Sequence, residues 1–188
     1  MIPLSVPNLC GNELKYVKKC IKTEWISTAG NYISLFEKKV ASYLNSKYAV
    51  ACINGTSALQ VALRILEVGN GDEVIVPTLT FIAPINSVIY NNAKPIFMDC
   101  DNFYNMDVEK TIKFIKNETV FRNNFTFNKK TKKRIPAILP VHLWGNAAKL
   151  ERLVKICKER NISIVEDAAE SFGTKYTNGN LKNRFTGT

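Results

Sequence analysis

The sequence predicts an α/β domain with a mostly parallel sheet whose two faces are covered by helices. Short segments that are apolar throughout alternate along the chain with amphipathic segments of about ten residues or more. Glycine, asparagine and proline residues separate these segments, as they do at turns between strands and helices. Strands without a polar face that alternate with helices are typical of βαβ units, because both faces of their sheet are buried.

The elements follow a simple order, with two helices first and then strands and helices in alternation. Apolar residues spaced three and four apart predict helices over residues 12–24, 31–44, 57–68, 80–90, 107–116 and 149–160. Continuous apolar runs predict strands over residues 48–53, 73–77, 94–99, 135–142 and 162–165. Pro84 is expected to interrupt the helix in which it lies.

Composition divides the chain into three parts. Residues 1–45 form the N-terminal helices, residues 46–173 the α/β core, and residues 174–188 a polar tail rich in glycine and asparagine. Within the core, residues 117–134 are a basic insertion that we interpret as a loop or hairpin. The tail stops without a terminating helix, which gives the chain an unfinished ending.

Composition also excludes several classes of protein. With 188 residues, 46% of them hydrophobic, the chain can bury an ordinary core. A membrane-spanning run of about eighteen apolar residues and a secretory signal are both missing, so we expect a cytoplasmic protein. One histidine, His142, and scattered cysteines that we expect to be reduced and buried provide no zinc or disulfide framework. The cysteines are Cys10, Cys20, Cys52, Cys100 and Cys157.

The net charge of +10 is concentrated in one segment. Residues 110–134 hold nine basic residues against one acid, so 9 − 1 = +8 of the charge lies there. A nucleic-acid-binding protein is one interpretation, since the segment also contains aromatic residues. The preferred interpretation is a solvated basic loop that could attract an anionic substrate over a long range, because the charge is confined to one insertion. The aromatic residues are Phe114, Phe121, Phe125 and Phe127.

A turn between the first strand and the next helix could hold a phosphate. Gly55, Thr56 and Ser57 lie where free amides and the helix dipole favour an anion, and two hydroxyls add donors. The alternative is that Thr56 only caps the helix. The segment lacks a G-x-G-x-x-G pattern, so we set aside a dinucleotide-binding fold.

Two further candidates follow strands. Asp167 comes directly after the last predicted strand, which places its carboxylate at the carboxyl edge of the sheet, where open α/β folds bind ligands. Phe81 follows the second strand and could lie flat against an aromatic ligand. The alternatives are a helix cap or surface ion pair for Asp167 and core packing for Phe81.

Taken together, these motifs resemble the DegT/DnrJ/StrS family of pyridoxal-phosphate-dependent nucleotide-sugar aminotransferases. The resemblance implies fold type I of the pyridoxal-phosphate-dependent transferases, with this chain in the large domain before the C-terminal small domain. The insertion, which ends in Asn-Lys-Lys-Thr, resembles the branch that aminates 4-keto-6-deoxy UDP-sugars for legionaminic-acid-type sugars. The matching stretches are residues 3–5, 25–30, 54–59, 71–77, 80–83, 140–142 and 166–171.

The resemblance implies a role for each candidate residue. Gly55, Thr56 and Ser57 would hold the cofactor phosphate through amides and hydroxyls. Phe81 would stack on the pyridine ring, and Asp167 would pair with the ring nitrogen. Glu170, where the family more often has glutamine, would lie near the ring hydroxyl. His142 matches the family's Pro-Val-His turn, and we interpret it as a neutral, structural histidine.

The resemblance also implies that a catalytic residue is missing. The family's Schiff-base lysine comes after the Glu-Asp-Ala segment, and we interpret Lys175 and Lys182, the only lysines there, as solvated surface charges. We therefore expect an N-terminal fragment that is inactive alone. A related sugar dehydratase, in which histidine replaces that lysine, is the alternative.

The partners are likewise those that the resemblance implies. The complete enzyme would take a nucleotide sugar and an amino donor, glutamate by analogy, and would form a homodimer that the loop 25–30 reaches toward. No nucleic acid or membrane partner is expected.

Overall fold

The structure is a computed structural model that describes residues 2–3, 6–28 and 30–188. Its internal contacts divide the chain after Ala51 into two units, which we describe separately. Parts of two family-like motifs, at positions 4, 5 and 29, lie outside the described residues.

The first unit contains the two expected helices, α1 (Glu13–Lys22) and α2 (Asn31–Tyr43). Tyr16 of α1 and Tyr32 of α2 meet edge to face, with ring centroids 5.1 Å apart. No residue within these two helices is buried, although both have an apolar face. The sequence pattern therefore predicted these helices correctly, but the first unit does not bury their apolar faces.

The second unit is built on a four-stranded sheet in which every neighbouring pair is parallel, as predicted. The strand order is β2-β1-β5-β6, and β1 is buried along its whole length. These strands are β1 (Glu73–Pro77), β2 (Lys94–Met98), β5 (Ala137–Ile138) and β6 (Ser163–Ile164).

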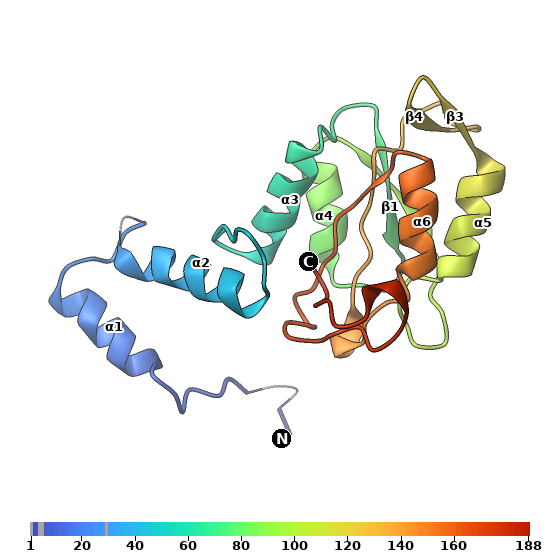
Figure 1. The fold of residues 1–188 in the computed structure, drawn as a ribbon. Helices are drawn as coiled ribbons and strands as arrows, with labels where there is room; N and C mark the ends of the chain where they lie inside the picture. The colour runs from blue at the N-terminus through green and yellow to red at the C-terminus, as the bar shows by residue number, and fades with distance from the viewer. Residues whose placement is uncertain (1, 4–5, 29) are drawn as a thin grey trace. The chain divides into compact units, whose positions relative to one another are not determined.

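Helices cover both faces of this sheet, which makes a three-layer α/β/α unit (Figure 1). Val74 and Val76 of β1 join the core cluster of α3 and α4, whereas Ile75 joins the cluster of α5 and α6. This alternation follows from the pleat of a strand, which points successive side chains to opposite faces. The helices are α3 (Gly55–Ile65), α4 (Ile82–Tyr90), α5 (Val108–Glu118) and α6 (Glu151–Glu159).

One predicted strand is wrong. Residues 48–53 form no strand, and Tyr48, Val50 and Ile53 are 72%, 81% and 92% exposed. An apolar run becomes a strand only when a neighbouring strand pairs with its backbone, and within the described chain none pairs here.

The predicted interruption at Pro84 is also wrong. Helix α4 begins at Ile82 and continues through Pro84 to Tyr90. Pro84 lies in the first turn, where an amide has no carbonyl partner inside the helix, so its missing N–H costs nothing there.

The cysteines are all free, but only Cys157 is buried. Burial raises the pKa of its thiol to about 12, so it stays protonated at neutral pH. The expectation that all five are buried is therefore wrong, since Cys10 and Cys52 are exposed.

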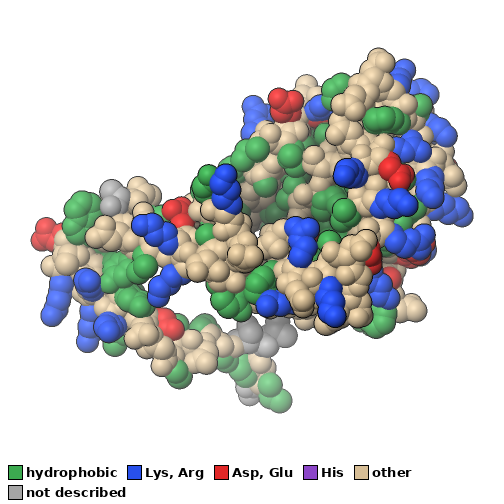
Figure 2. Space-filling view, viewed as in Figure 1, with side chains coloured by type: hydrophobic (Ala, Val, Ile, Leu, Met, Phe, Trp, Pro, Cys, Tyr) green, Lys and Arg blue, Asp and Glu red, His purple; other side chains and the backbone are tan. Residues whose placement is uncertain are grey.

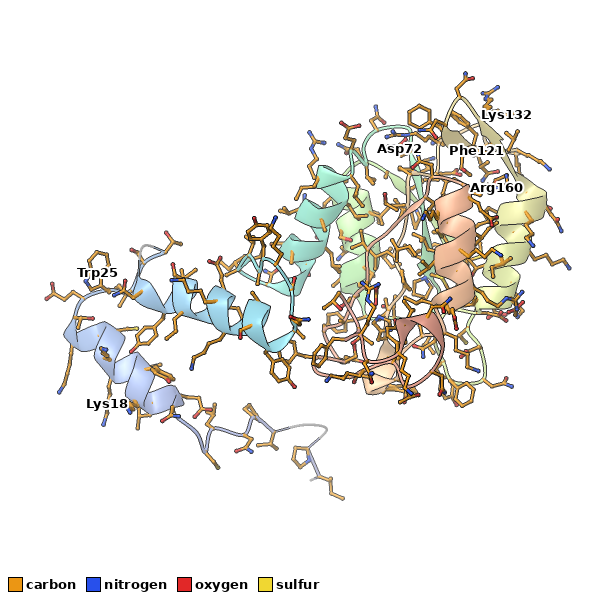
Figure 3. All side chains as sticks on the ribbon, viewed as in Figure 1. Lys18, Trp25, Asp72, Phe121, Lys132 and Arg160 are labelled. Atoms are coloured by element: carbon orange, nitrogen blue, oxygen red, sulfur yellow. The ribbon has the colours of Figure 1, made fainter. Side chains whose placement is uncertain are left out.

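The basic insertion forms a hairpin of β3 (Thr119–Arg122) and β4 (Phe125–Asn128). Several hydrogen bonds join the insertion to the start of β1. Asn128 donates to the Glu73 carboxylate at 2.8 Å, and Arg134 donates two hydrogen bonds to Asp72. Lys and Arg side chains gather around α5 and this hairpin (Figure 2), and Phe121, Lys132 and Asp72 lie at this end of the unit (Figure 3).

This position corrects the expected long-range role of the basic charge. The hairpin lies at the amino edge of the sheet, opposite the carboxyl edge where parallel sheets bind ligands. A five-residue strand separates the two edges by roughly 16 Å. That distance is well beyond the screening length of about 8 Å at physiological salt, so the attraction at the far edge is weak.

The tail crosses back over the carboxyl edge. It contains a short 3-10 turn, η2 (Gly179–Leu181), and an antiparallel bridge between Lys175 and Phe185. As expected, it adds no further strand and helix pair. Among the described residues, no helix has the length and apolar character needed to cross a membrane.

Candidate functional site

The carboxyl edge of the sheet brings together the residues that the sequence singled out. Val165 packs into the core cluster of α3 and α4, so Asp167, two residues further on, points to the same face. Phe81 is the N-cap of α4, four residues after β1 ends. Helix α3 leads back into the start of β1 through a short turn, so Gly55 at its N-terminus also lies at the carboxyl edge (Figure 1).

The N-terminus of α3 presents unused hydrogen-bond donors. The side chain of Asn54, not Thr56, caps the helix by accepting the amide of Ser57 at 2.8 Å. In the described chain the amides of Gly55 and Thr56 and the hydroxyls of Thr56 and Ser57 have no acceptor. A Cβ atom added at Gly55 would meet nothing within 4 Å, so the space beside this residue is open to a ligand. Such donors at the positive end of a helix suit an anion.

Two neighbouring residues at the start of α4 are not used by the core. Phe81 is 77% exposed, which rules out the core-packing alternative. In the described part of the chain, the hydroxyl oxygen of Thr80 is buried and has no hydrogen-bond partner. Because buried polar groups are normally paired, this hydroxyl is consistent with a site that a ligand or an ordered water completes.

The Asp167 side chain is only partly engaged. The Asp167 backbone is bound into the sheet through a bridge with Val141 and a 2.9 Å hydrogen bond from its amide to Pro140. Its Oδ1 accepts the amide of Ala169 at 3.0 Å. No donor in the described part of the chain contacts Oδ2. A rigid backbone therefore carries a half-buried carboxylate with one oxygen left for a ligand.

Glu170 contacts a part of the chain that the sequence did not point to. Its Oε2 accepts the amide of Trp144 at 2.6 Å. Trp144 lies in the 3-10 turn η1 (Leu143–Gly145) that follows β5. Glu170 is thus at the expected edge, but its carboxylate supports the backbone of a neighbouring loop.

The opposite face of the same edge holds a buried polar network around Glu166. The ring of His142 is fully buried, and its Nε2 lies 2.7 Å from Glu166 Oε2. The amide of Ala148 donates to His142 Nδ1 at 3.0 Å, so Nδ1 carries no proton and Nε2 donates to Glu166. His142 is therefore held as one neutral tautomer, in agreement with the structural role expected for it.

The same Glu166 oxygen also holds the tail. The amide of Gly187 donates to it at 2.9 Å and the hydroxyl of Tyr176 at 3.3 Å. Burial would raise the pKa of Glu166, but the hydrogen bonds from His142, Gly187 and Tyr176 outweigh it and lower this pKa. Burial and the nearby Glu166 carboxylate raise the pKa of Tyr176, so both groups keep their charge states at neutral pH.

The two late lysines fit the expectation of surface charges. Lys175 and Lys182 are exposed, and the Lys175 ammonium lies 4.4 Å from the centre of the Phe185 ring. Among the described residues, no cluster of three or more potential metal ligands is present.

Sequence reasoning missed two parts of this edge, the Glu166 network and the Trp144 contact. Glu166 was visible only as a neighbour of Asp167, although alternation along a strand places the two carboxylates on opposite faces. Nothing in the local sequence indicates that Trp144 contacts Glu170, because the two residues meet only through the fold.

Comparison with known proteins identifies what the chain is similar to. A model of the DegT/DnrJ/EryC1/StrS aminotransferase family matches residues 7–187. A GDP-perosamine synthase of Escherichia coli O157:H7 is 42% identical over all 188 residues of this chain, which cover 46% of that protein.

Solved structures agree with the family match. A DegT/DnrJ/EryC1/StrS aminotransferase from Brucella abortus superimposes with a TM-score of 0.78 at 34% identity, covering 92% of this chain and 43% of that one. GDP-4-keto-6-deoxymannose-3-dehydratase with a trapped PLP–glutamate geminal diamine superimposes with a TM-score of 0.77 at 26% identity, covering 94% and 43%. The chain therefore spans just under half the length of these relatives.

Proposed function

The chain belongs to the DegT/DnrJ/EryC1/StrS aminotransferase family, and on that premise we propose that it forms the cofactor-holding part of a pyridoxal-phosphate-dependent aminotransferase acting on a nucleotide sugar. The observation that carries the proposal is that the open end of α3, the exposed Phe81 ring and the free oxygen of Asp167 belong to one edge and one face of the sheet.

The chemistry of the donors fits the cofactor phosphate. The free amides of Gly55 and Thr56, with the hydroxyls of Thr56 and Ser57, would hold it at the N-terminus of α3. The Ser57 amide takes no part because Asn54 already accepts it, so Ser57 would contribute its hydroxyl only.

The remaining residues fit the cofactor ring. Phe81 would lie against the ring face, and Asp167 would hold a proton on the ring nitrogen through its unused oxygen. Bound pyridoxal phosphate supplies an electron sink for chemistry at the substrate amine. The backbone keeps Asp167 in place, since it forms a parallel bridge with Val141, in the segment that follows β5.

Glu170 would act beside the ring rather than on it. Its Oε2 accepts the Trp144 amide, and we propose that it thereby fixes the η1 loop next to the ring hydroxyl.

The proposed substrate is a 4-keto-6-deoxy nucleotide sugar with glutamate as amino donor. Support comes from the relatives, one named for GDP-perosamine and one for GDP-4-keto-6-deoxymannose with a trapped PLP–glutamate adduct. The legionaminic-acid branch, a homodimeric complete enzyme and a cytoplasmic location stay predictions. The similarity to a 3-dehydratase keeps a sugar dehydratase as the second candidate, since its cofactor site would use the same residues.

We also propose that these 188 residues alone do not transfer amino groups. Within these 188 residues, the only lysines after Asp167 are Lys175 and Lys182, and both are exposed. Neither therefore has the buried setting that activates a lysine for covalent chemistry.

Titrating the purified chain with pyridoxal phosphate tests these proposals. We expect saturable, reversible binding that Thr56→Val weakens and Thr56→Ser preserves, because serine keeps the hydroxyl. Absence of saturable binding, or equal binding by Thr56→Val, would contradict the cofactor site. Borohydride reduction followed by peptide mapping should find no single lysine modified, and one specific modified lysine would contradict the proposed inactivity.

A further inference from the structure

Two aromatic residues at the carboxyl edge have a backbone conformation that bulky side chains rarely adopt. Tyr104, in the loop after β2, has φ of 66°, and Trp144, in the loop after β5, has φ of 52°. The other non-glycine residues with positive φ in the described chain are asparagine, glutamate or lysine. Asparagine tolerates this region, whereas for a bulky aromatic residue it is an outlier that points to a constraint or a function.

Core packing does not explain the two rings. Their centroids lie 5.1 Å apart in an edge-to-face arrangement, but Tyr104 is 51% exposed and Trp144 62% exposed. A strained backbone is usually maintained where surrounding contacts fix it. Here that strain holds two aromatic faces toward solvent.

The loop that carries Tyr104 is fixed by its own carboxylate. Asp101 Oδ1 accepts the amides of Phe103 at 2.8 Å and Asn105 at 3.1 Å. The Tyr104 amide donates to the backbone carbonyl of Asp101 at 3.0 Å.

The buried side chain of Asn105 then joins the two loops. Its Oδ1 accepts the amide of Leu143 at 3.1 Å, and its Nδ2 donates to the carbonyl of Asn146 at 3.2 Å. Glu170 completes the arrangement by accepting the Trp144 amide. The aromatic pair is thus held in place before any ligand binds, which lowers the entropy cost of binding.

We propose that Tyr104 and Trp144 form a stacking subsite for the base of a nucleoside diphosphate. This inference rests on the proposed function, which requires a nucleotide sugar at this edge. Exposed, rigid aromatic faces bind planar bases by stacking. Trp144 is tied to Glu170, three residues beyond Asp167, so a base on Trp144 is close to the proposed cofactor site.

A cation contacts the residue that precedes Tyr104 in sequence. The Lys149 ammonium is 4.8 Å from the centre of the Phe103 ring. Among the described residues no carboxylate forms an ion pair with Lys149. We therefore assign Lys149 to the diphosphate as a point charge.

Tryptophan fluorescence can test the subsite directly, because the chain has two tryptophans, Trp25 and Trp144. In Trp25→Phe, Trp144 is the only indole. We expect GDP, UDP and guanosine to quench its emission saturably and inorganic diphosphate to have no effect. Trp144→Phe, which keeps Trp25, should show no saturable quenching and is the matched control.

Equilibrium dialysis with labelled GDP measures the affinity. Stacking on one base is worth about 1–3 kcal/mol, so Trp144→Ala should weaken GDP binding about 5- to 150-fold. Glu170→Ala should weaken it as well, whereas Glu170→Gln, which keeps an acceptor for the Trp144 amide, should preserve it. Tyr104→Ala provides a second variant of the pair if Trp144→Ala does not fold.

Three outcomes would overturn the subsite: no quenching by GDP at millimolar concentration, equal binding by inorganic diphosphate, or unchanged GDP affinity in both alanine variants of the pair. Lys149→Ala should weaken GDP binding and leave guanosine binding unaffected, and equal losses of affinity for both would contradict its assigned role.

GDP binding is measured without cofactor. A chain that binds GDP but not pyridoxal phosphate would therefore contradict the proposed function and leave this subsite standing, and the reverse result would do the opposite.

Discussion

Adjacent carboxylates at the end of β6 are used in opposite ways on the two faces of the sheet. Glu166, on the face of α5 and α6, accepts hydrogen bonds from His142, Tyr176 and Gly187 on one oxygen. Asp167, on the face of α3 and α4, accepts one and keeps an oxygen free. The fold uses the first carboxylate to join three distant groups, and the second is the one that we propose for the ligand. Residue type alone therefore does not distinguish the two acids.

The largest effect should come from removing the structural carboxylate. Glu166→Ala leaves three donors without their acceptor, two of them in buried or half-buried residues, and should lower the free energy of unfolding by about 2–4 kcal/mol. Asp167→Ala is the matched control and should cost less than about 1 kcal/mol, because it loses a single hydrogen bond. Urea denaturation at pH 7 measures both values. Equal losses would mean that the two acids do not differ as described.

For pyridoxal-phosphate affinity we expect the reverse order, with a larger loss on substitution of Asp167 than of Glu166. Asp167→Asn removes the charge that would pair with the ring nitrogen, and should weaken pyridoxal-phosphate binding by about 10- to 100-fold, as expected for a hydrogen bond between charged groups. Glu166→Gln should change that affinity by less than about threefold, since Glu166 faces away from the site. Fluorescence titration compares the two variants, and a larger loss in Glu166→Gln would contradict the division between the faces.

A smaller effect should appear in the pH dependence of stability. The folded chain lowers the pKa of Glu166, so the ionised carboxylate stabilises the fold above the ordinary glutamate pKa of about 4.3. That contribution is lost as the pH falls below this value through the lowered folded pKa. In urea denaturation between pH 6 and 3, Glu166→Gln should lose less stability than the wild-type chain. If the free energy of unfolding of both chains falls in parallel with pH, ionisation of Glu166 does not contribute to stability.

The smallest effect should come from the hairpin at the amino edge. Lys130 and Lys132 are exposed there, at the edge of the sheet opposite the carboxyl edge that carries Asp167. Replacing both with alanine should change the affinities for pyridoxal phosphate and GDP by less than about twofold at 0.15 M salt, because the charge is screened over that distance. A large loss in the same titrations would place the basic charge near the ligand.

The contrast between α3 and the 48–53 segment shows how far local pattern reaches. Helix α3 was predicted from its apolar spacing, because its hydrogen bonds are made within the segment. The apolar run before it has the composition of a strand, but a strand depends on a partner elsewhere in the chain, and none pairs with it here.

The candidate site divides in the same way. Gly55, Thr56, Phe81 and Asp167 could be chosen from the sequence because each follows a strand or begins a helix, and the parallel topology brings such positions to one edge. Three other features are harder to predict from the sequence than these positions. They are the Asn54 cap, the Glu166 network and the contact between Glu170 and Trp144. Their partners are separated by a few to dozens of residues and are selected by side-chain geometry.

By itself, the sequence determined the α/β class, the parallel sheet and the positions that reach its carboxyl edge, since periodicity and turn residues act over short stretches of chain. Only the tertiary structure decided that Glu166 accepts three hydrogen bonds on Oε2 whereas the Asp167 carboxylate accepts one. It also decided that the basic hairpin lies at the opposite edge and that Tyr104 meets Trp144. These properties depend on which distant groups meet and exclude water, and that is fixed only when the chain packs.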